Sequence, residues 1–163
     1  MSKSKKNHPA TNAIRVLAEA GVEFEVLPYK YVERGGTRHS AEQLGVDEHT
    51  MVKTLIMEDQ DRRPLIVLMH GDREVSTKSL ARQMGVKSIH PCSPAVANKH
   101  SGYFVGGTSP LGTRHKMPVF AESTIFDLPC IHLNAGHRGL MLRLNPHDLH
   151  KVLEITPVNA AIA

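Results

Sequence analysis

The sequence contains no tryptophan, and aromatic residues make up only 4% of its 163 residues. This composition argues against a platform of stacked aromatic rings that binds single-stranded nucleic acid. No apolar run approaches the roughly 20 residues of a membrane-spanning helix, and no apolar stretch follows the basic N-terminus, which argues against a secretory signal. The two cysteines, Cys92 and Cys130, do not make a disulfide framework. We therefore expect a protein of a reducing compartment, the cytoplasm.

The charge is nearly balanced, with 20 Lys and Arg against 16 Asp and Glu and a formal net charge of +4. Such a mild bias permits a polyanionic partner but does not demand one. Because Lys3, Lys5 and Lys6 crowd the N-terminus, we expect residues 1–8 to form a flexible basic tail. The length fits one domain, which we place at residues 9–156, with a C-terminal tail at residues 157–163.

Hydrophobic periodicity and turn residues predict short elements in an irregular order. The helices are expected at residues 9–20, 40–45, 77–84, 94–99 and 146–153. The strands are expected at residues 24–26, 51–57, 64–69, 86–90, 103–105, 117–121, 129–133 and 139–144. The second and third strands flank a charged turn and predict a hairpin. Since strands and helices neither alternate strictly nor segregate fully, the predicted fold class is α+β with a mixed, curled sheet.

Metal and nucleophile motifs are weak. His147 and His150 lie three residues apart on an expected helix and could face one ion, but no HExxH or CxxC pattern accompanies them. Solvated or core-edge histidines are the better interpretation, and we expect no metal and no cofactor. No GxSxG motif is present, and Cys92 has no motif that favours a catalytic thiol.

Two glycine-rich segments and one lysine are the stronger candidates. Gly106, Gly107, Thr108 and Ser109 form a loop in which backbone amides can approach a ligand closely and hydroxyls can donate. The spacing is neither that of a Walker loop nor that of a dinucleotide-binding loop, and an ordinary tight turn is the alternative. Residues 134–139 form a second glycine turn, for which a hairpin turn is favoured. Lys53 lies inside an apolar strand, either on its solvated face or as a partner for an anion or carbonyl.

Three segments together resemble the YbaK family of freestanding aminoacyl-tRNA deacylases, which is similar to the editing domain inserted in bacterial prolyl-tRNA synthetases. They are Val52-Lys-Thr-Leu-Ile56, Gly102-Tyr-Phe-Val-Gly-Gly-Thr-Ser-Pro-Leu-Gly112 and Asn134-Ala-Gly-His-Arg-Gly-Leu140. The resemblance runs from about residue 10 to about residue 153. It implies a mixed, partly open β-barrel flanked by helices, with one pocket for the 3′ end of a charged tRNA.

The resemblance also implies roles for single residues. The family lysine falls on Lys53, which is expected to hold the terminal phosphate or ribose region. The family glycine whose backbone lines the reacting ester falls on Gly106, and the pocket tyrosine falls on Tyr29. Asn134 stands where the best-known cysteine editors have serine, which leaves the amino-acid preference open. The remaining substrate-binding candidates are Gly107, Thr108 and Ser109.

The expected function is trans-editing hydrolysis of a mischarged tRNA, with cysteinyl-tRNA(Pro) favoured. Backbone donors in the glycine loop suit the oxyanion of ester hydrolysis, and the substrate's own thiol or a ribose hydroxyl can assist. The alternatives are an alanyl- or seryl-tRNA deacylase of the same family, a non-catalytic protein that binds tRNA or a synthetase, and a hydrolase of a non-tRNA ester. The expected partners are the aminoacylated 3′ end of tRNA and prolyl-tRNA synthetase, without a membrane.

Overall fold

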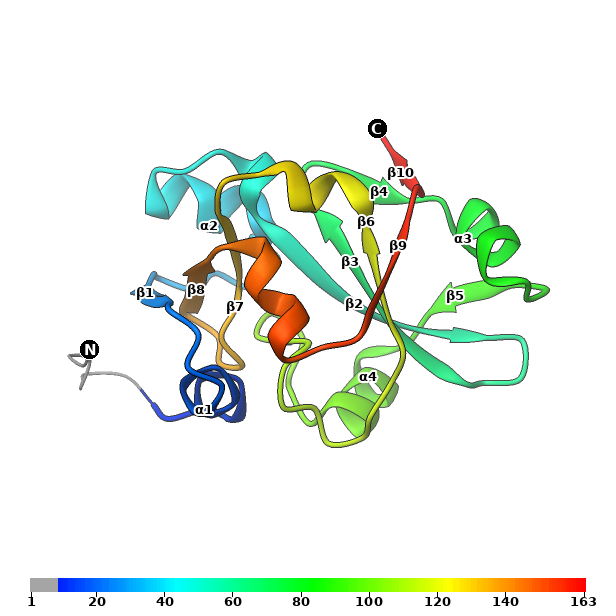
Figure 1. The fold of residues 1–163 in the computed structure, drawn as a ribbon, viewed down its shortest axis with the longest axis horizontal. Coiled ribbons are helices and arrows are strands. Elements are labelled where there is room, and N and C mark those ends of the chain that lie inside the picture. Colours follow the sequence, from blue (N-terminus) through cyan, green and yellow to red (C-terminus); the bar gives the residue numbers. More distant parts are fainter. Residues whose placement is uncertain (1–8) are drawn as a thin grey trace.

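The computed structural model describes residues 9–163, and the expected tail at residues 1–8 lies outside the described residues. Three sheets carry the fold, in the strand orders β5-β2-β3-β6-β9, β1-β8-β7 and β10-β4 (Figure 1). The strands are β1 Glu25–Pro28, β2 Val52–Asp59, β3 Pro64–His70, β4 Glu74–Val75, β5 Ile89–Pro91, β6 Val119–Glu122, β7 Ile131–Asn134, β8 Leu140–Leu144, β9 Ile155–Val158 and β10 Ala161–Ile162. The α-helices are α1 Asn12–Glu19, α2 Gly36–Leu44, α3 Thr77–Met84 and α4 Pro94–Ser101. Short 3₁₀ turns are η1 Glu48–Thr50, η2 Ser123–Asp127 and η3 Pro146–Lys151.

The β2–β3 hairpin is the centre of the largest sheet and confirms the predicted pairing. Its antiparallel register runs from Val52 opposite His70 to Glu58 opposite Pro64. β3 pairs with β6, and β6 with β9, in parallel, so the sheet is mixed. The sheets do not close on one another, which confirms the α+β class with an open, mixed arrangement. None of the helices within residues 9–163 is long and apolar enough to cross a membrane.

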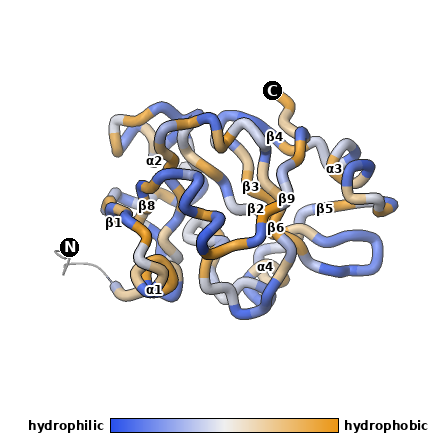
Figure 2. Tube along the Cα trace, viewed as in Figure 1, coloured by the Kyte–Doolittle hydropathy of each residue, from blue (hydrophilic) through white to orange (hydrophobic). Residues whose placement is uncertain are grey.

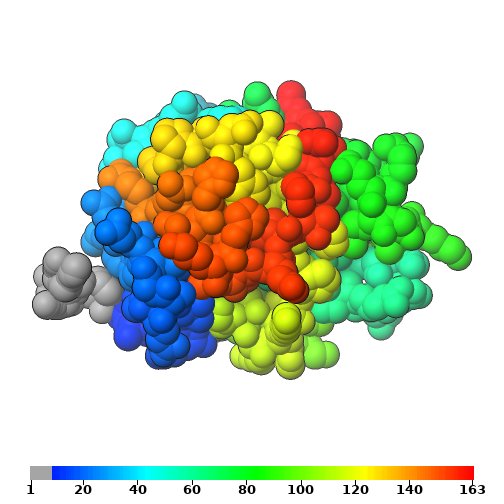
Figure 3. All heavy atoms as spheres, viewed as in Figure 1, coloured from blue at the N-terminus to red at the C-terminus, as the bar shows by residue number. Residues whose placement is uncertain are grey.

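The core lies on both faces of the largest sheet. The larger hydrophobic cluster joins one face of β2 and β3 to α1, β7 and β8, and the smaller one packs the other face against α3. Figure 2 shows the apolar stretches of these strands inside the molecule and the hydrophilic β2–β3 turn at its periphery. On the face drawn in Figure 3, residues near 10–25, in blue, lie beside residues near 140–150, in orange. Packing on both faces therefore holds β2 and β3 firmly in place.

Two helical predictions need correction. The helix expected at residues 40–45 begins earlier, at Gly36, and ends at Leu44. The Ser40 hydroxyl donates to the carbonyls of Gly36 and Thr37, so it bonds back along the helix instead of capping it. The expected helix at residues 146–153 is the 3₁₀ turn Pro146–Lys151, which Asn145 caps by accepting from the His147 amide.

Two strand predictions also differ from the structure. The expected strand at residues 103–105 is a loop, because the Tyr103 amide donates to the Ser101 hydroxyl and the Tyr103 carbonyl accepts from the Asn98 side chain. The expected tail at residues 157–163 instead continues into β9 and β10, which pair with β6 and β4. Pro157 obscures this strand in the sequence, since proline is tolerated only at a sheet edge, and β9 is such an edge.

Candidate functional site

A cavity of about 580 Å³ lies beside the N-terminal half of β2. β5 pairs only with Met57, Glu58 and Asp59, and an isolated parallel bridge joins Met51, just before β2, to His132 of β7. Between these two contacts β2 pairs only with β3 among residues 9–163. The opposite wall comes from α4 and the loop at residues 102–112, and the 29–37 segment and β7 complete it. A cavity of this size suits a small ligand or one end of a larger one.

Lys53 lies on this strand and lines the cavity. Its side chain is only 20% exposed, and its Nζ lies 3.6 Å from a carboxylate oxygen of Glu74. The same Nζ donates to the carbonyl oxygen of Arg73. These contacts hold a cation at the wall of an otherwise largely apolar cavity, where it attracts an anionic or strongly polarised ligand.

Gly106 lines the cavity at the tip of the 102–112 loop. Its φ of +97° is a left-handed conformation that favours glycine, and a Cβ there would lie 2.7 Å from the Tyr31 hydroxyl. The amide of Gly107 donates to the Phe104 carbonyl at 2.9 Å. No partner for the Gly106 amide is found within residues 9–163, which leaves that N–H available to a ligand.

The other loop candidates divide into two groups. Thr108 lines the cavity, although its hydroxyl also donates to the Phe104 carbonyl at 3.3 Å. Gly107 and Ser109 are buried and do not line it. A Cβ on Gly107 would lie 2.8 Å from the Arg138 amide, and the Ser109 hydroxyl accepts from the Leu111 amide. Through these contacts Gly107 and Ser109 stabilise the shape of the loop. Direct contact of either residue with a ligand stays a prediction.

Tyr29 and Asn134 both line the cavity, as does Thr54, which the sequence analysis did not single out. Burial raises the pKa of Tyr29 above its usual value, so its hydroxyl stays protonated at neutral pH. Asn134 Oδ1 and Thr54 Oγ1 are buried without a hydrogen-bond partner within the described residues. Such orphaned atoms are costly unless a ligand or water satisfies them. Because both residues line the cavity, a side-chain rotation would bring these buried atoms to a bound molecule.

The rim of the cavity holds further residues that the sequence analysis missed. Tyr31, Arg34 and His39 line it, and the Arg138 guanidinium lies 5.1 Å from the Tyr31 ring centre. His39 Nε2 donates to the Lys30 carbonyl at 3.0 Å, which leaves Nδ1 as an acceptor in the neutral ring. Gly36 lines the cavity as well, and the sequence analysis did not single it out.

The structure gives no support to the weaker sequence candidates, a catalytic Cys92 thiol and a metal site at His147 and His150. Cys92 lines the cavity, but burial and the charge of Glu58 raise the pKa of its thiol to about 11, which disfavours a thiolate nucleophile. The rings of His147 and His150 lie 6.5 Å apart. Neither belongs to a group of three metal-ligand side chains within residues 9–163.

Comparisons with known proteins agree on one family. The family model described as the aminoacyl-tRNA editing domain matches residues 36–152. The Enterococcus faecalis protein named "Putative Cys-tRNA(Pro)/Cys-tRNA(Cys) deacylase EbsC" is 27% identical over 146 residues, 89% of each chain. A proline–tRNA ligase of Levilactobacillus brevis is 25% identical over 132 residues, 81% of this chain but 21% of the ligase.

A solved structure shows the same fold. The crystal structure of "a putative trans-editing enzyme for prolyl tRNA synthetase" superposes with a TM-score of 0.78 at 17% identity, and the match covers 93% of this chain and 99% of that one. The family model covers well over half of the sequence, and its match includes β2, the 102–112 loop and Asn134, which all contribute residues to the cavity wall. The chain belongs to the aminoacyl-tRNA editing domain family.

Proposed function

We propose that this protein is a trans-editing deacylase that hydrolyses the ester of a mischarged tRNA, with cysteinyl-tRNA(Pro) as its preferred substrate. The observation that carries the proposal is the gathering of Lys53, the unpaired Gly106 amide and two orphaned polar atoms around one cavity. The Enterococcus relative matches over 89% of its own length and bears a name that includes Cys-tRNA(Pro). The proline–tRNA ligase of Levilactobacillus brevis aligns with this chain over 21% of its own length. Prolyl-tRNA synthetase is therefore the partner proposed to supply the tRNA in the cytoplasm.

The proposed chemistry needs a donor where negative charge develops. Gly106 lines the cavity and its N–H has no hydrogen-bond partner within residues 9–163, so it is a candidate donor to the ester oxyanion. Lys53 binds the ribose or the terminal phosphate. For cysteine, the thiol sulfur bonds to the ester carbon, the bond from that carbon to the ribose oxygen breaks, and the thiol proton passes to that oxygen. Water then hydrolyses the released thiolactone, so no protein nucleophile is consumed.

The amino acid itself is proposed to lie against Asn134 and Thr54. Their orphaned oxygens accept hydrogen bonds from the α-ammonium group, which every aminoacyl ester carries. A charged donor to a buried acceptor is the stronger class of hydrogen bond. Phe104 lies within the 102–112 loop and is 70% exposed, so it offers a stacking surface for a base at the tRNA end.

The test is a deacylation assay with proline tRNA carrying cysteine, alanine, serine or proline. We expect fast release of cysteine, spared proline, and loss of release in the Lys53→Ala variant. Tight tRNA binding without release of any amino acid would instead support the non-catalytic alternative. Equal turnover of small aminoacyl esters with and without attached RNA would support the hydrolase of a non-tRNA ester.

A further inference from the structure

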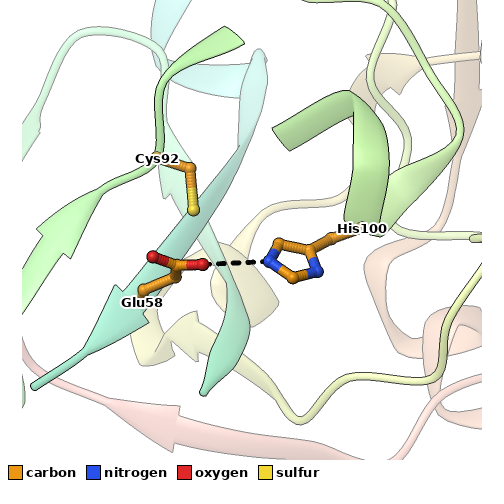
Figure 4. Close-up of side chains that lie close together, drawn as sticks. All are labelled: Glu58, Cys92 and His100. Carbon is orange, nitrogen blue, oxygen red and sulfur yellow. Dashed lines mark hydrogen bonds and ion pairs between the residues drawn. The ribbon is translucent and has the colours of Figure 1, made fainter. Parts of the chain in front are cut away.

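Three side chains with metal-binding groups converge where β5 leads into α4. Glu58 lies on β2, Cys92 directly follows β5 and His100 lies on α4. Their carboxylate, thiol and imidazole ligand atoms all lie within 4.8 Å of one another. His100 Nε2 is 3.0 Å from Glu58 Oε2, and Figure 4 shows the three side chains pointing toward one another from three separate elements.

The strand register adds a fourth donor to this group. His90 stands directly opposite Glu58 in the antiparallel pair of β2 and β5, so both side chains lie on one face of the sheet. The Cys92 amide donates to the Ile56 carbonyl at 3.1 Å and continues the register, which puts Cys92 on the same face as His90 two residues before it. His90 Nε2 lies 4.0 Å from Glu58 Oε1.

The charges around Glu58 leave room for a cation. Its carboxylate is only 14% exposed, and its ion-pair partners within residues 9–163 are the two histidines His90 and His100, which carry a charge only when protonated. No lysine or arginine within that part of the chain pairs with it. A half-buried carboxylate without a permanent cation is costly, and a divalent ion would offset that cost.

We propose that Glu58, Cys92 and His100, together with His90, bind a Zn²⁺ ion. One sulfur, two imidazole nitrogens and one carboxylate oxygen form a donor set that Zn²⁺ takes in tetrahedral geometry. Bonds of about 2.0–2.3 Å place such donors roughly 3.3–3.8 Å apart. The ligand atoms of Glu58, Cys92 and His100, all within 4.8 Å of one another, are near these separations. The more exposed His90 lies outside that group and must turn toward it to bind. A thiolate and imidazoles select against Mg²⁺ and Ca²⁺. The thiolate and the carboxylate together balance the charge of the ion.

The bound ion would hold α4 against the hairpin. Cys92 and two α4 residues, Pro94 and Ala97, also line the cavity beside β2. Zinc at this site would therefore fix one wall of the cavity without entering the chemistry assigned to Lys53 and Gly106. The thiol must lose its proton to bind, so zinc binding releases a proton.

The experiment measures the metal directly and needs no deacylation assay. The full chain is stripped with a chelator, reloaded with Zn²⁺ or Co²⁺, and separated from free ion. We expect one ion per chain, a thiolate-to-cobalt charge-transfer band and a raised melting temperature. Cys92→Ser should weaken zinc binding by roughly 100-fold or more, because loss of even an outer partner of a metal ligand costs 10- to 100-fold. Cys130→Ser, which changes the other free cysteine, should bind as the parent does.

A measurement on the unchanged chain avoids any effect of substitution on folding. With zinc, one of the two thiols should be protected from a thiol reagent, and mass mapping should identify it as Cys92. The proposal would be overturned if zinc changed the labelling of neither thiol. A zinc stoichiometry near zero, or a Cys92→Ser variant that binds zinc as tightly as the parent, would also overturn it.

Discussion

Lys53 differs from an ordinary surface lysine because its side chain is largely buried and lines the cavity. Lys53→Ala should reduce deacylation by roughly 100-fold, the scale of losing one charged contact to the reacting group. Stability should change little, since its ion-pair partner Glu74 is 75% exposed and such pairs contribute about 0–1 kcal/mol. The measurement is single-turnover deacylation with circular dichroism on the same sample.

Two matched variants separate this effect from a general loss of charge. Lys78→Ala removes an exposed lysine of α3 that does not line the cavity, and Glu74→Gln removes the acidic partner of Lys53 while keeping the cation. Lys78→Ala should retain activity. Glu74→Gln removes one contact of Lys53 at the cavity wall and should lose far less activity than Lys53→Ala. A Lys53→Ala variant within a factor of two of the parent would rule out a direct role for this lysine.

At the scale of the element, the 102–112 loop depends on a glycine at position 106. Gly106→Ala should lower turnover by about 10- to 100-fold, because the new Cβ would press on Tyr31 and a shift of about 1 Å in a reacting group has effects of that size. The control is Gly85→Ala, which has a similar positive φ of +76° at the end of α3 but meets nothing within 4 Å. Equal activity losses in the two variants would assign the effect to backbone strain alone.

Two buried histidines tie neighbouring elements together in their neutral form. His70 Nδ1 donates to the His49 carbonyl and its Nε2 accepts from the Thr124 hydroxyl, both at 2.8 Å. His132 Nε2 accepts from the Arg143 guanidinium at 3.0 Å. Burial, as the largest cause, lowers the pKa of both rings below the ordinary value of 6.5. Protonation would break the bond that each Nε2 accepts.

The sign of the resulting pH dependence follows from linkage. Below about pH 6.5 the unfolded chain binds protons at these rings that the folded chain does not, so stability is present above that pH and is lost as pH falls. The free energy of unfolding, measured by urea titration, should fall between pH 7.5 and 5.5 by at most about 1.4 kcal/mol per pH unit for each ring. His70→Gln should flatten this dependence, whereas His115→Gln, at an exposed position, should not. An unchanged slope in His70→Gln would contradict the assignment.

The sequence predicted the β2–β3 hairpin better than it predicted the 102–112 loop. The hairpin of β2 and β3 was predictable because apolar runs flank a charged turn, in which Asp59 accepts from the Asp61 and Arg63 amides. Lys53 and Gly106 were both predicted as site residues, and both line one cavity. Thr54 was missed because one threonine in a strand carries no pattern. Gly107 and Ser109 lie off the cavity although Gly106 and Thr108 line it. Gly107 packs against the Arg138 amide, a tertiary contact that spacing does not encode.

At the scale of the whole molecule, specificity depends on what the cavity rejects. A pocket that senses size alone separates substrates differing by one methylene only about 10- to 200-fold. Asn134 and Thr54 offer acceptors to any α-ammonium group, so they do not distinguish cysteine from alanine or serine. A route in which the substrate thiol attacks its own ester does distinguish them, because alanine has no such nucleophile.

This reasoning predicts the outcome on one tRNA body. Cysteine should be released from proline tRNA much faster than alanine, and serine should fall between them, since a hydroxyl is the poorer nucleophile at neutral pH. Asn134→Ser restores the residue expected in cysteine editors and should preserve that order while enlarging the cavity. Fast alanine release with slow cysteine release in the parent chain would instead mean that water attacks the ester, and would place this protein among deacylases of alanyl- or seryl-tRNA. The deciding measurement is the ratio of single-turnover rates for the three esters, with uncatalysed hydrolysis of each subtracted.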